Sequence, residues 1–129
     1  MNYRKVKSKI RSNFGRGVNY KPPGSSFHII AVDFDGVLAG KSRRGKLGKP
    51  IEGMLTAIPK LAKRFELVVF SSRAIHPNGH QDIIAWLEKH NLKEYFSRIT
   101  STKINALAYL DDRAVRFSDW PATLEYFNA

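Results

Sequence analysis

The chain of 129 residues contains no cysteine, and its 11 acidic residues are outnumbered by 22 Lys and Arg. The absence of cysteine excludes disulfide bonds, a thiol nucleophile and a thiolate zinc site. Chemistry must therefore come from carboxylates, hydroxyls, amines or histidines. No apolar run approaches the roughly 20 residues that a membrane-spanning helix needs. The basic N-terminal residues are not followed by the apolar stretch of a secretory signal, so we expect a cytoplasmic protein without membrane contact.

Two segments lack acidic residues altogether. Residues 1–26 carry seven Lys and Arg, and residues 39–50 (AGKSRRGKLGKP) carry five more, whereas the rest is close to neutral. Glycine, proline and serine interrupt the first segment, which predicts a mostly disordered arm ahead of one domain over 27–129. Concentrated positive charge favours nucleic acid or phosphate-bearing substrates. A solubilising tail and a solvated loop would have the same composition.

Short apolar runs alternate with amphipathic segments from residue 27 onward. Nearly continuous apolar runs are typical of strands buried on both faces. They predict strands over 27–32, 67–70, 98–100 and 106–110, with an edge strand at 115–117.

Helical spacing of apolar residues fills the intervals between these strands. It predicts a helix over 54–65 that starts or kinks near Pro59, and another around 83–90 after a break at Asn78-Gly79. Pro121 is placed to open a short C-terminal helix. The alternation predicts an α/β fold, a three-layer, Rossmann-like, mainly parallel sheet with helices on both faces. Only the basic loop separates the first strand from the helix near 54, which leaves a minimal cap.

A polar group of residues stands where each predicted strand stops. These residues are Asp33, Asp35 and Gly36, then Ser71, Ser72 and Arg73, then Lys103, and finally Asp111 and Asp112. Ligands of open parallel sheets bind beyond the carboxyl ends of the strands, so we expect these side chains to converge. Four carboxylates close together repel one another unless a cation binds, and Mg²⁺ prefers oxygen ligands of this kind.

Two other metal sites are excluded by their spacing. A calcium loop needs a further acidic residue or asparagine two positions after Asp35, where Val37 stands instead. His76 and His80 have the four-residue spacing of a helical zinc pair, but Pro77 and the Asn-Gly pair intervene. We therefore predict that both histidines are loop residues.

The strand ends also carry a family resemblance. IIAVDFDGVL at 29–38 resembles the first motif of haloacid-dehalogenase-like phosphatases, and VVFSSR at 68–73 resembles the second. Lys103 stands where the third motif has its lysine, and ALAYLDDRA at 106–114 resembles the fourth. The resemblance covers about residues 27–120. It is strongest to small phage and bacterial members without a large cap, and to the phosphatase half of polynucleotide kinase-phosphatases.

The resemblance implies a role for each catalytic residue. Asp33 would be the nucleophile and a metal ligand, and Asp35 the general acid and base, with its backbone carbonyl on the metal. Ser71 would hydrogen-bond the transferring phosphoryl group, which Lys103 would neutralise.

The resemblance also implies metal-binding and substrate-binding residues. Asp112 is favoured as the direct ligand and Asp111 as its supporting partner, although the reverse assignment stays open. Arg73 would bind substrate phosphate, together with Ser72 and the backbone at Gly36.

The sequence departs from the family pattern at three positions. Val37 and Ser71 each replace a commoner threonine, and Ile104 follows Lys103 where proline is frequent. The first two changes keep the required chemistry, whereas the third makes the register of Lys103 less certain.

The function that follows is Mg²⁺-dependent hydrolysis of a phosphomonoester through an aspartyl-phosphate, on nucleotides or nucleic-acid termini. A non-catalytic nucleic-acid-binding module on the same scaffold is the alternative from another class. A phosphotransferase that passes the phosphoryl group to an alcohol is the third.

Overall fold

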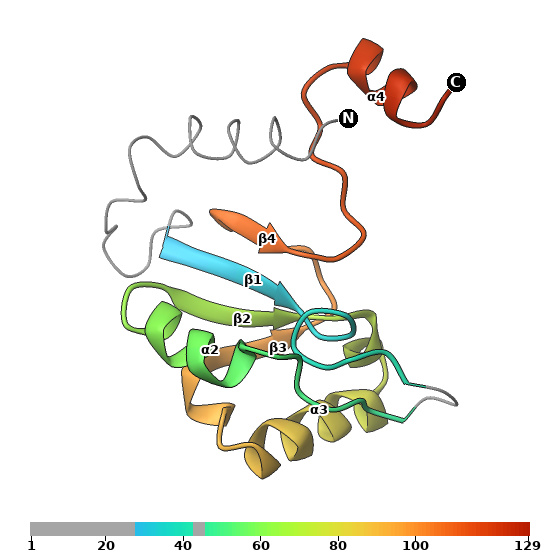
Figure 1. Ribbon diagram of the computed structural model, residues 1–129. Coiled ribbons are helices and arrows are strands. Elements are labelled where there is room, and N and C mark those ends of the chain that lie inside the picture. The colour runs from blue at the N-terminus through green and yellow to red at the C-terminus, as the bar shows by residue number, and fades with distance from the viewer. Residues whose placement is uncertain (1–27, 43–45) are drawn as a thin grey trace. The chain divides into compact units, whose positions relative to one another are not determined.

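The computed structural model describes residues 28–42 and 46–129 (Figure 1). The chain divides into two compact units, Tyr20–Asp112 and a second that includes Arg113–Ala129, and each is described by itself. The arm predicted over 1–26 lies outside the described residues, as does the tip of the basic loop at 43–45. The prediction of one domain over 27–129 stays a prediction.

Four parallel strands form the sheet of the first unit in the order β3-β2-β1-β4 (Figure 1). They are β1 (Ile29–Asp33), β2 (Glu66–Phe70), β3 (Phe96–Thr100) and β4 (Ala108–Leu110). The two central strands are almost entirely apolar because they are buried on both faces, and Val32 and Val69 are fully buried. The prediction of an α/β fold with a parallel sheet is thus confirmed.

The register of the sheet decides which polar residues become neighbours. Val32 of β1 pairs with Leu110 of β4, so the next residues on the two chains are Asp33 and Asp111. On the other side of β1, Asp33 pairs with Phe70, the last residue of β2 before Ser71. Three of the predicted polar groups therefore meet at one edge of the sheet.

Two helices connect the first three strands. They are α2 (Met54–Ala62), between β1 and β2, and α3 (Pro77–Lys89), between β2 and β3. Both connections move across the sheet in the same direction, so right-handed crossovers place both helices on one face. Residues 101–107, which connect β3 to β4, contain no helix. Among the described residues, no helix is long and apolar enough to cross a membrane.

Helix α3 begins earlier than the sequence pattern predicts. Pro77 opens it, and a proline at the first helical position loses no hydrogen bond because its missing N–H would have no partner there. Asn78 and Gly79 lie within the helix and do not interrupt it. Gly79 is required because a side chain there would overlap the carbonyl of Arg73.

Three further local predictions are corrected. His80 lies within α3, so the prediction that it is a loop residue was wrong, whereas His76 lies outside the helix, directly before Pro77, as predicted. Pro59 lies inside α2 and does not start it. Residues 115–117 form no strand.

The short C-terminal helix is confirmed in the second unit. It is α4 (Trp120–Tyr126), with Pro121 in its first turn. Asp119 caps it, because its carboxylate accepts a hydrogen bond of 2.7 Å from the backbone N–H of Ala122.

An aromatic contact connects the segment after β1 to helix α3. Phe34 is fully buried, and its ring meets that of Trp86 edge to face, with the centroids 4.9 Å apart. The indole N–H of Trp86 donates a hydrogen bond of 2.8 Å to the carbonyl of Gly48 in the basic loop. The loop is thereby attached to the core of the fold.

The substitution Trp86→Phe tests this attachment. It keeps an aromatic ring near Phe34 but leaves the Gly48 carbonyl without its donor, so we expect a loss of about 1–2 kcal/mol in unfolding free energy. Urea unfolding measures the loss. Trp120→Phe is the matched control, since that ring is 68% exposed. Equal stabilities of the two variants would contradict the proposed attachment.

Candidate active site

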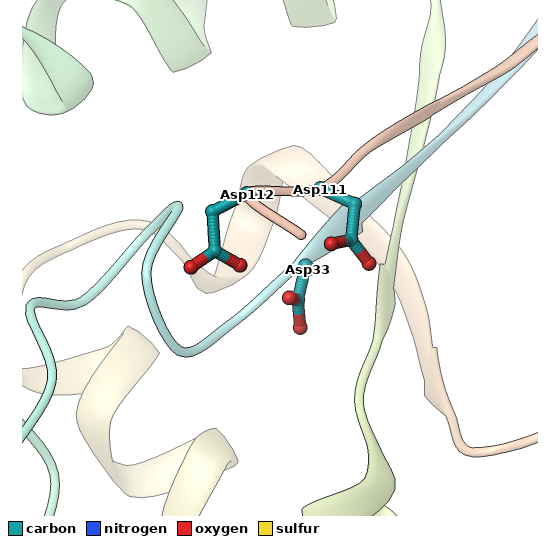
Figure 2. A group of neighbouring side chains, drawn as sticks. All are labelled: Asp33, Asp111 and Asp112. Carbon is teal, nitrogen blue, oxygen red and sulfur yellow. The ribbon is translucent and has the colours of Figure 1, made fainter. Parts of the chain in front are cut away.

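Three carboxylates converge at the carboxyl end of the sheet (Figure 2). Asp33 comes from the end of β1, and Asp111 and Asp112 follow β4 directly. One carboxylate oxygen from each lies within 4.8 Å of the others. Residues 78 positions apart in the sequence thus form one acidic cluster, by which we mean Asp33, Asp111 and Asp112.

The environment of Asp33 disfavours its negative charge. Burial is the largest cause and raises the pKa of the Asp33 carboxyl above its usual value. A hydrogen bond of 2.7 Å from the backbone N–H of Phe34 works in the opposite direction. The nearby charges of Asp111, Asp112 and Asp35 raise the pKa further. A bound cation would relieve this repulsion.

Gly36 allows Asp112 to approach the segment after β1. Its φ of +85° belongs to the left-handed region, and a Cβ atom at this position would overlap the Asp112 carboxylate. Its backbone N–H donates 2.7 Å to the carbonyl of Ala39, which closes the turn. The role that the structure gives Gly36 is therefore to make room for an acidic side chain.

Asp35 is not part of the acidic cluster. Its two carboxylate oxygens accept hydrogen bonds from Arg73, at 2.6 Å from Nε and 3.0 Å from a terminal nitrogen. This fork is the strong, geometrically specific form of the ion pair, and it raises the pKa of the Arg73 guanidinium. The sequence predicts separate roles for the two residues, and no sequence pattern indicates their pairing, because 38 positions separate them.

Ser71 lies at the end of β2, as the sequence predicts, and is only 3% exposed. Its hydroxyl oxygen accepts a hydrogen bond of 3.2 Å from the backbone N–H of Arg73. Ser71 thereby caps η2 (Ser72–Ile75), a short 3-10 helix whose first residue is exposed. The cap fixes the hydroxyl beside the strand end and leaves its proton available to another acceptor.

Lys103 is not brought to the acids by any contact within the described residues. Its side chain is exposed, and Nζ lies 5.7 Å from the centre of the Tyr109 ring. The irregular segment between β3 and β4 carries it. Its predicted neutralising role stays a prediction.

A different lysine contacts the acidic cluster. The ammonium of Lys41, in the basic loop, lies 3.2 Å from Oδ2 of Asp112. The sequence showed only that the loop is basic, and no spacing singled out this residue, since its position depends on how the loop folds back.

A separate hollow of about 250 Å³ lies between α3 and the strand β3. It is lined by His80, Ile84, Leu87, Lys93, Phe96, Ser97, Arg98 and Ile99. None of the residues predicted to form the active site lines it.

The acidic cluster fits a hard divalent cation. Its donors are all oxygens, as Mg²⁺ prefers, and ligands of octahedral Mg²⁺ are about 3–4 Å apart. The 4.8 Å limit of the cluster is close to that span, so small side-chain rotations would complete it. Asp111 and Asp112 each offer an oxygen within 4.8 Å of an oxygen of Asp33, so either can be the direct ligand.

Comparison with known proteins supports the fold alone. A solved structure described as a conserved protein from Bacteroides thetaiotaomicron is similar, with a TM-score of 0.58 and 24% sequence identity. The match covers 79% of this chain and 90% of that chain. No family model and no curated protein matches the sequence.

The substitution Asp33→Asn is expected to stabilise the metal-free protein at neutral pH. A raised pKa means that the folded state holds its proton to higher pH than the unfolded state, so wild-type stability falls as pH rises above the ordinary value of 3.8. Asn removes the charge and keeps the acceptor for the Phe34 N–H. After allowance for solvent screening, we expect a gain of about 0.5 kcal/mol, or about 2–4 °C in Tm.

Thermal unfolding in EDTA at pH 7 and near pH 4 measures this gain. It should shrink as the pH falls and wild-type Asp33 takes up its proton. Glu52→Gln, at an exposed position in the same unit, is the control for loss of one negative charge. A lower Tm for Asp33→Asn at pH 7 would contradict the inferred repulsion.

Proposed function

We propose that the protein is a Mg²⁺-dependent phosphomonoester hydrolase that forms an aspartyl-phosphate, with a haloacid-dehalogenase-like fold. The observation that carries the proposal is the acidic cluster at the carboxyl ends of β1 and β4, next to a buried serine at the end of β2. The motif resemblance places a nucleophile, a phosphate-binding hydroxyl and metal ligands at these same positions. A three-layer sheet with helices on both faces and a minimal cap is the finer fold that belongs to this proposal.

The metal would be held by Asp33 and by the acidic pair after β4, with the backbone carbonyl of Asp35. When bound, Mg²⁺ supplies positive charge that offsets the carboxylates and polarises the phosphoryl oxygens. The residues of the chain supply the nucleophile, the proton and the hydrogen bonds.

The first chemical step is an attack by a carboxylate oxygen of Asp33 on phosphorus. A P–O bond forms to Asp33, and the P–O bond to the leaving alcohol breaks as Asp35 gives that oxygen its proton. In the second step water attacks the phosphorus and returns a proton to Asp35. The Asp33–phosphorus bond breaks, which releases inorganic phosphate and restores the carboxylate.

Asp35 must leave its pair with Arg73 before it can donate a proton to a substrate. A phosphoryl group offers the guanidinium a comparable pair of anionic oxygens, so substrate can take the place of Asp35 on Arg73. The same event would orient the phosphate and free Asp35 to take up from solvent the proton that it then gives to the leaving oxygen. Ser71 lies two residues before Arg73 and would add a hydrogen bond to the phosphoryl oxygens.

The basic arm and loop favour phosphates on nucleotides or nucleic-acid termini as substrates. Lys and Arg in these segments would attract a polyanion through long-range, salt-sensitive forces. The short segment between β1 and α2 would leave only a minimal cap, and an open site would admit a phosphate on a large molecule.

The substitution Asp33→Asn is also the test of the chemistry. Purified wild-type protein should release phosphate from an aryl phosphate and from 3′-phosphorylated DNA only when Mg²⁺ is present. The variant lacks the nucleophilic oxygen, so its rate should fall at least about 1000-fold. Colorimetric phosphate detection measures both rates, and Glu52→Gln should keep the wild-type rate.

Other outcomes of this assay separate the alternatives. Full activity of Asp33→Asn would eliminate the proposed nucleophile. Salt-dependent DNA binding without turnover on any phosphorylated substrate would favour the non-catalytic nucleic-acid module. A phosphorylated alcohol among the products, after an acceptor alcohol is added, would identify a phosphotransferase.

The pair Arg73→Lys and Arg73→Ala tests the exchange at Asp35. Lysine keeps the charge but cannot form the fork, so we expect kcat/KM to fall about 10-fold for lysine and about 100-fold or more for alanine. Added guanidinium should restore part of the alanine variant's activity and none of the lysine variant's. Steady-state kinetics with an aryl phosphate gives both results, and a wild-type kcat/KM for alanine would refute the exchange.

A further inference from the structure

The basic loop is folded back against the acidic site by its own backbone. Gly40 donates its N–H to the carbonyl of Lys49 at 2.8 Å, and Ala39 forms an antiparallel bridge with Pro50. A side chain at Gly48 would overlap the Gly40 carbonyl, so the two sides of the loop approach each other as closely as glycine permits. We call this pairing of 39–40 with 48–50 the neck of the loop.

The neck directs Lys41 toward the acidic cluster. Lys41 follows Gly40 directly, and its ammonium lies 3.2 Å from Oδ2 of Asp112. The same oxygen lies against the backbone of Gly36, at the turn that follows β1. Lys41 thus places a positive charge on one of the three carboxylates that would bind the metal.

The pair between Lys41 and Asp112 is weak enough to be exchanged. The lysine side chain is 58% exposed and the Asp112 side chain 25%, and an ion pair that water reaches contributes little net free energy. A divalent cation carries twice the charge and contacts several carboxylates at once. The cation can therefore displace the ammonium, and the flexible side chain of Lys41 allows the ammonium to move into solvent.

We propose that Lys41 is a displaceable counter-ion of the metal site. Its ammonium pairs with Asp112 before the metal binds, and metal binding releases it toward the substrate. The inference rests on the proposed function, because it takes the acidic cluster as the metal site. Before loading, Lys41 lowers the repulsion among the carboxylates. After loading, its ammonium is free to pair with an anionic group of the substrate near the metal.

The first experiment titrates Mg²⁺ alone into EDTA-stripped full-length protein, with calorimetry as the readout. Lys41→Gln has no ammonium to displace, so we expect it to bind Mg²⁺ about 3- to 5-fold more tightly than wild type. Lys49→Gln is the matched control, because it removes the same charge from an exposed position of the same loop. It should change the affinity less than 2-fold, and Lys41→Arg should bind no more tightly than wild type.

A second titration with inorganic phosphate follows the released ammonium. With saturating Mg²⁺, Lys41→Gln should bind phosphate about 3-fold more weakly than wild type. Without Mg²⁺, the two proteins should bind phosphate equally, because in wild type Asp112 then holds the ammonium.

The outcomes distinguish this inference from the function on which it rests. Equal Mg²⁺ affinities for wild type, Lys41→Gln and Lys49→Gln would overturn the displacement and leave the metal site intact. Weaker Mg²⁺ binding by Lys41→Gln would also overturn the displacement, as would an equal increase in Mg²⁺ affinity in both glutamine variants. No Mg²⁺ binding by any of the proteins would overturn the metal site itself.

Discussion

The parallel pairing of β1 with β4 is the constraint on which the site depends. Val32 lies opposite Leu110, so the chain beyond the two strands must place Asp33 beside Asp111. A shift of the register by one residue would turn alternate side chains to the other face and separate the carboxylates. The apolar residues that bury these strands therefore also bring negative charges together. Burial of the Asp33 carboxyl, followed by the nearby carboxylates, raises its pKa.

Two carboxylates near the strand ends are each paired with a cation from a segment distant in sequence. Arg73 from η2 holds Asp35, and Lys41 from the basic loop holds Asp112. Both cations come from segments that begin just beyond the carboxyl end of a strand. If the proposed function holds, these two cations occupy positions that a metal ion and a phosphate would take.

Much of the fold could be predicted from the sequence because buried parallel strands leave a nearly continuous apolar pattern. The convergence of Asp33 with the pair after β4 also followed from the rule on strand ends. The start of α3 could not be predicted, since an Asn-Gly pair usually marks a turn. Here Gly79 is helical, and its lack of a side chain makes room for the Arg73 carbonyl. Long-range side-chain pairs were missed for a different reason. The partners of Asp35 and Asp112 depend on how loops fold back, and loops carry no periodic pattern.

The neck of the basic loop also limits how the protein can be lengthened. Gly40 and Gly48 are in such close contact that neither side of the neck has room for an insertion. Extra residues placed between Ser42 and Lys46 would instead lengthen the loop beyond the neck, while the hydrogen bond from Gly40 to Lys49 stayed in place. A longer loop could therefore evolve, or be engineered, at this point without altering the spacing of the carboxylates.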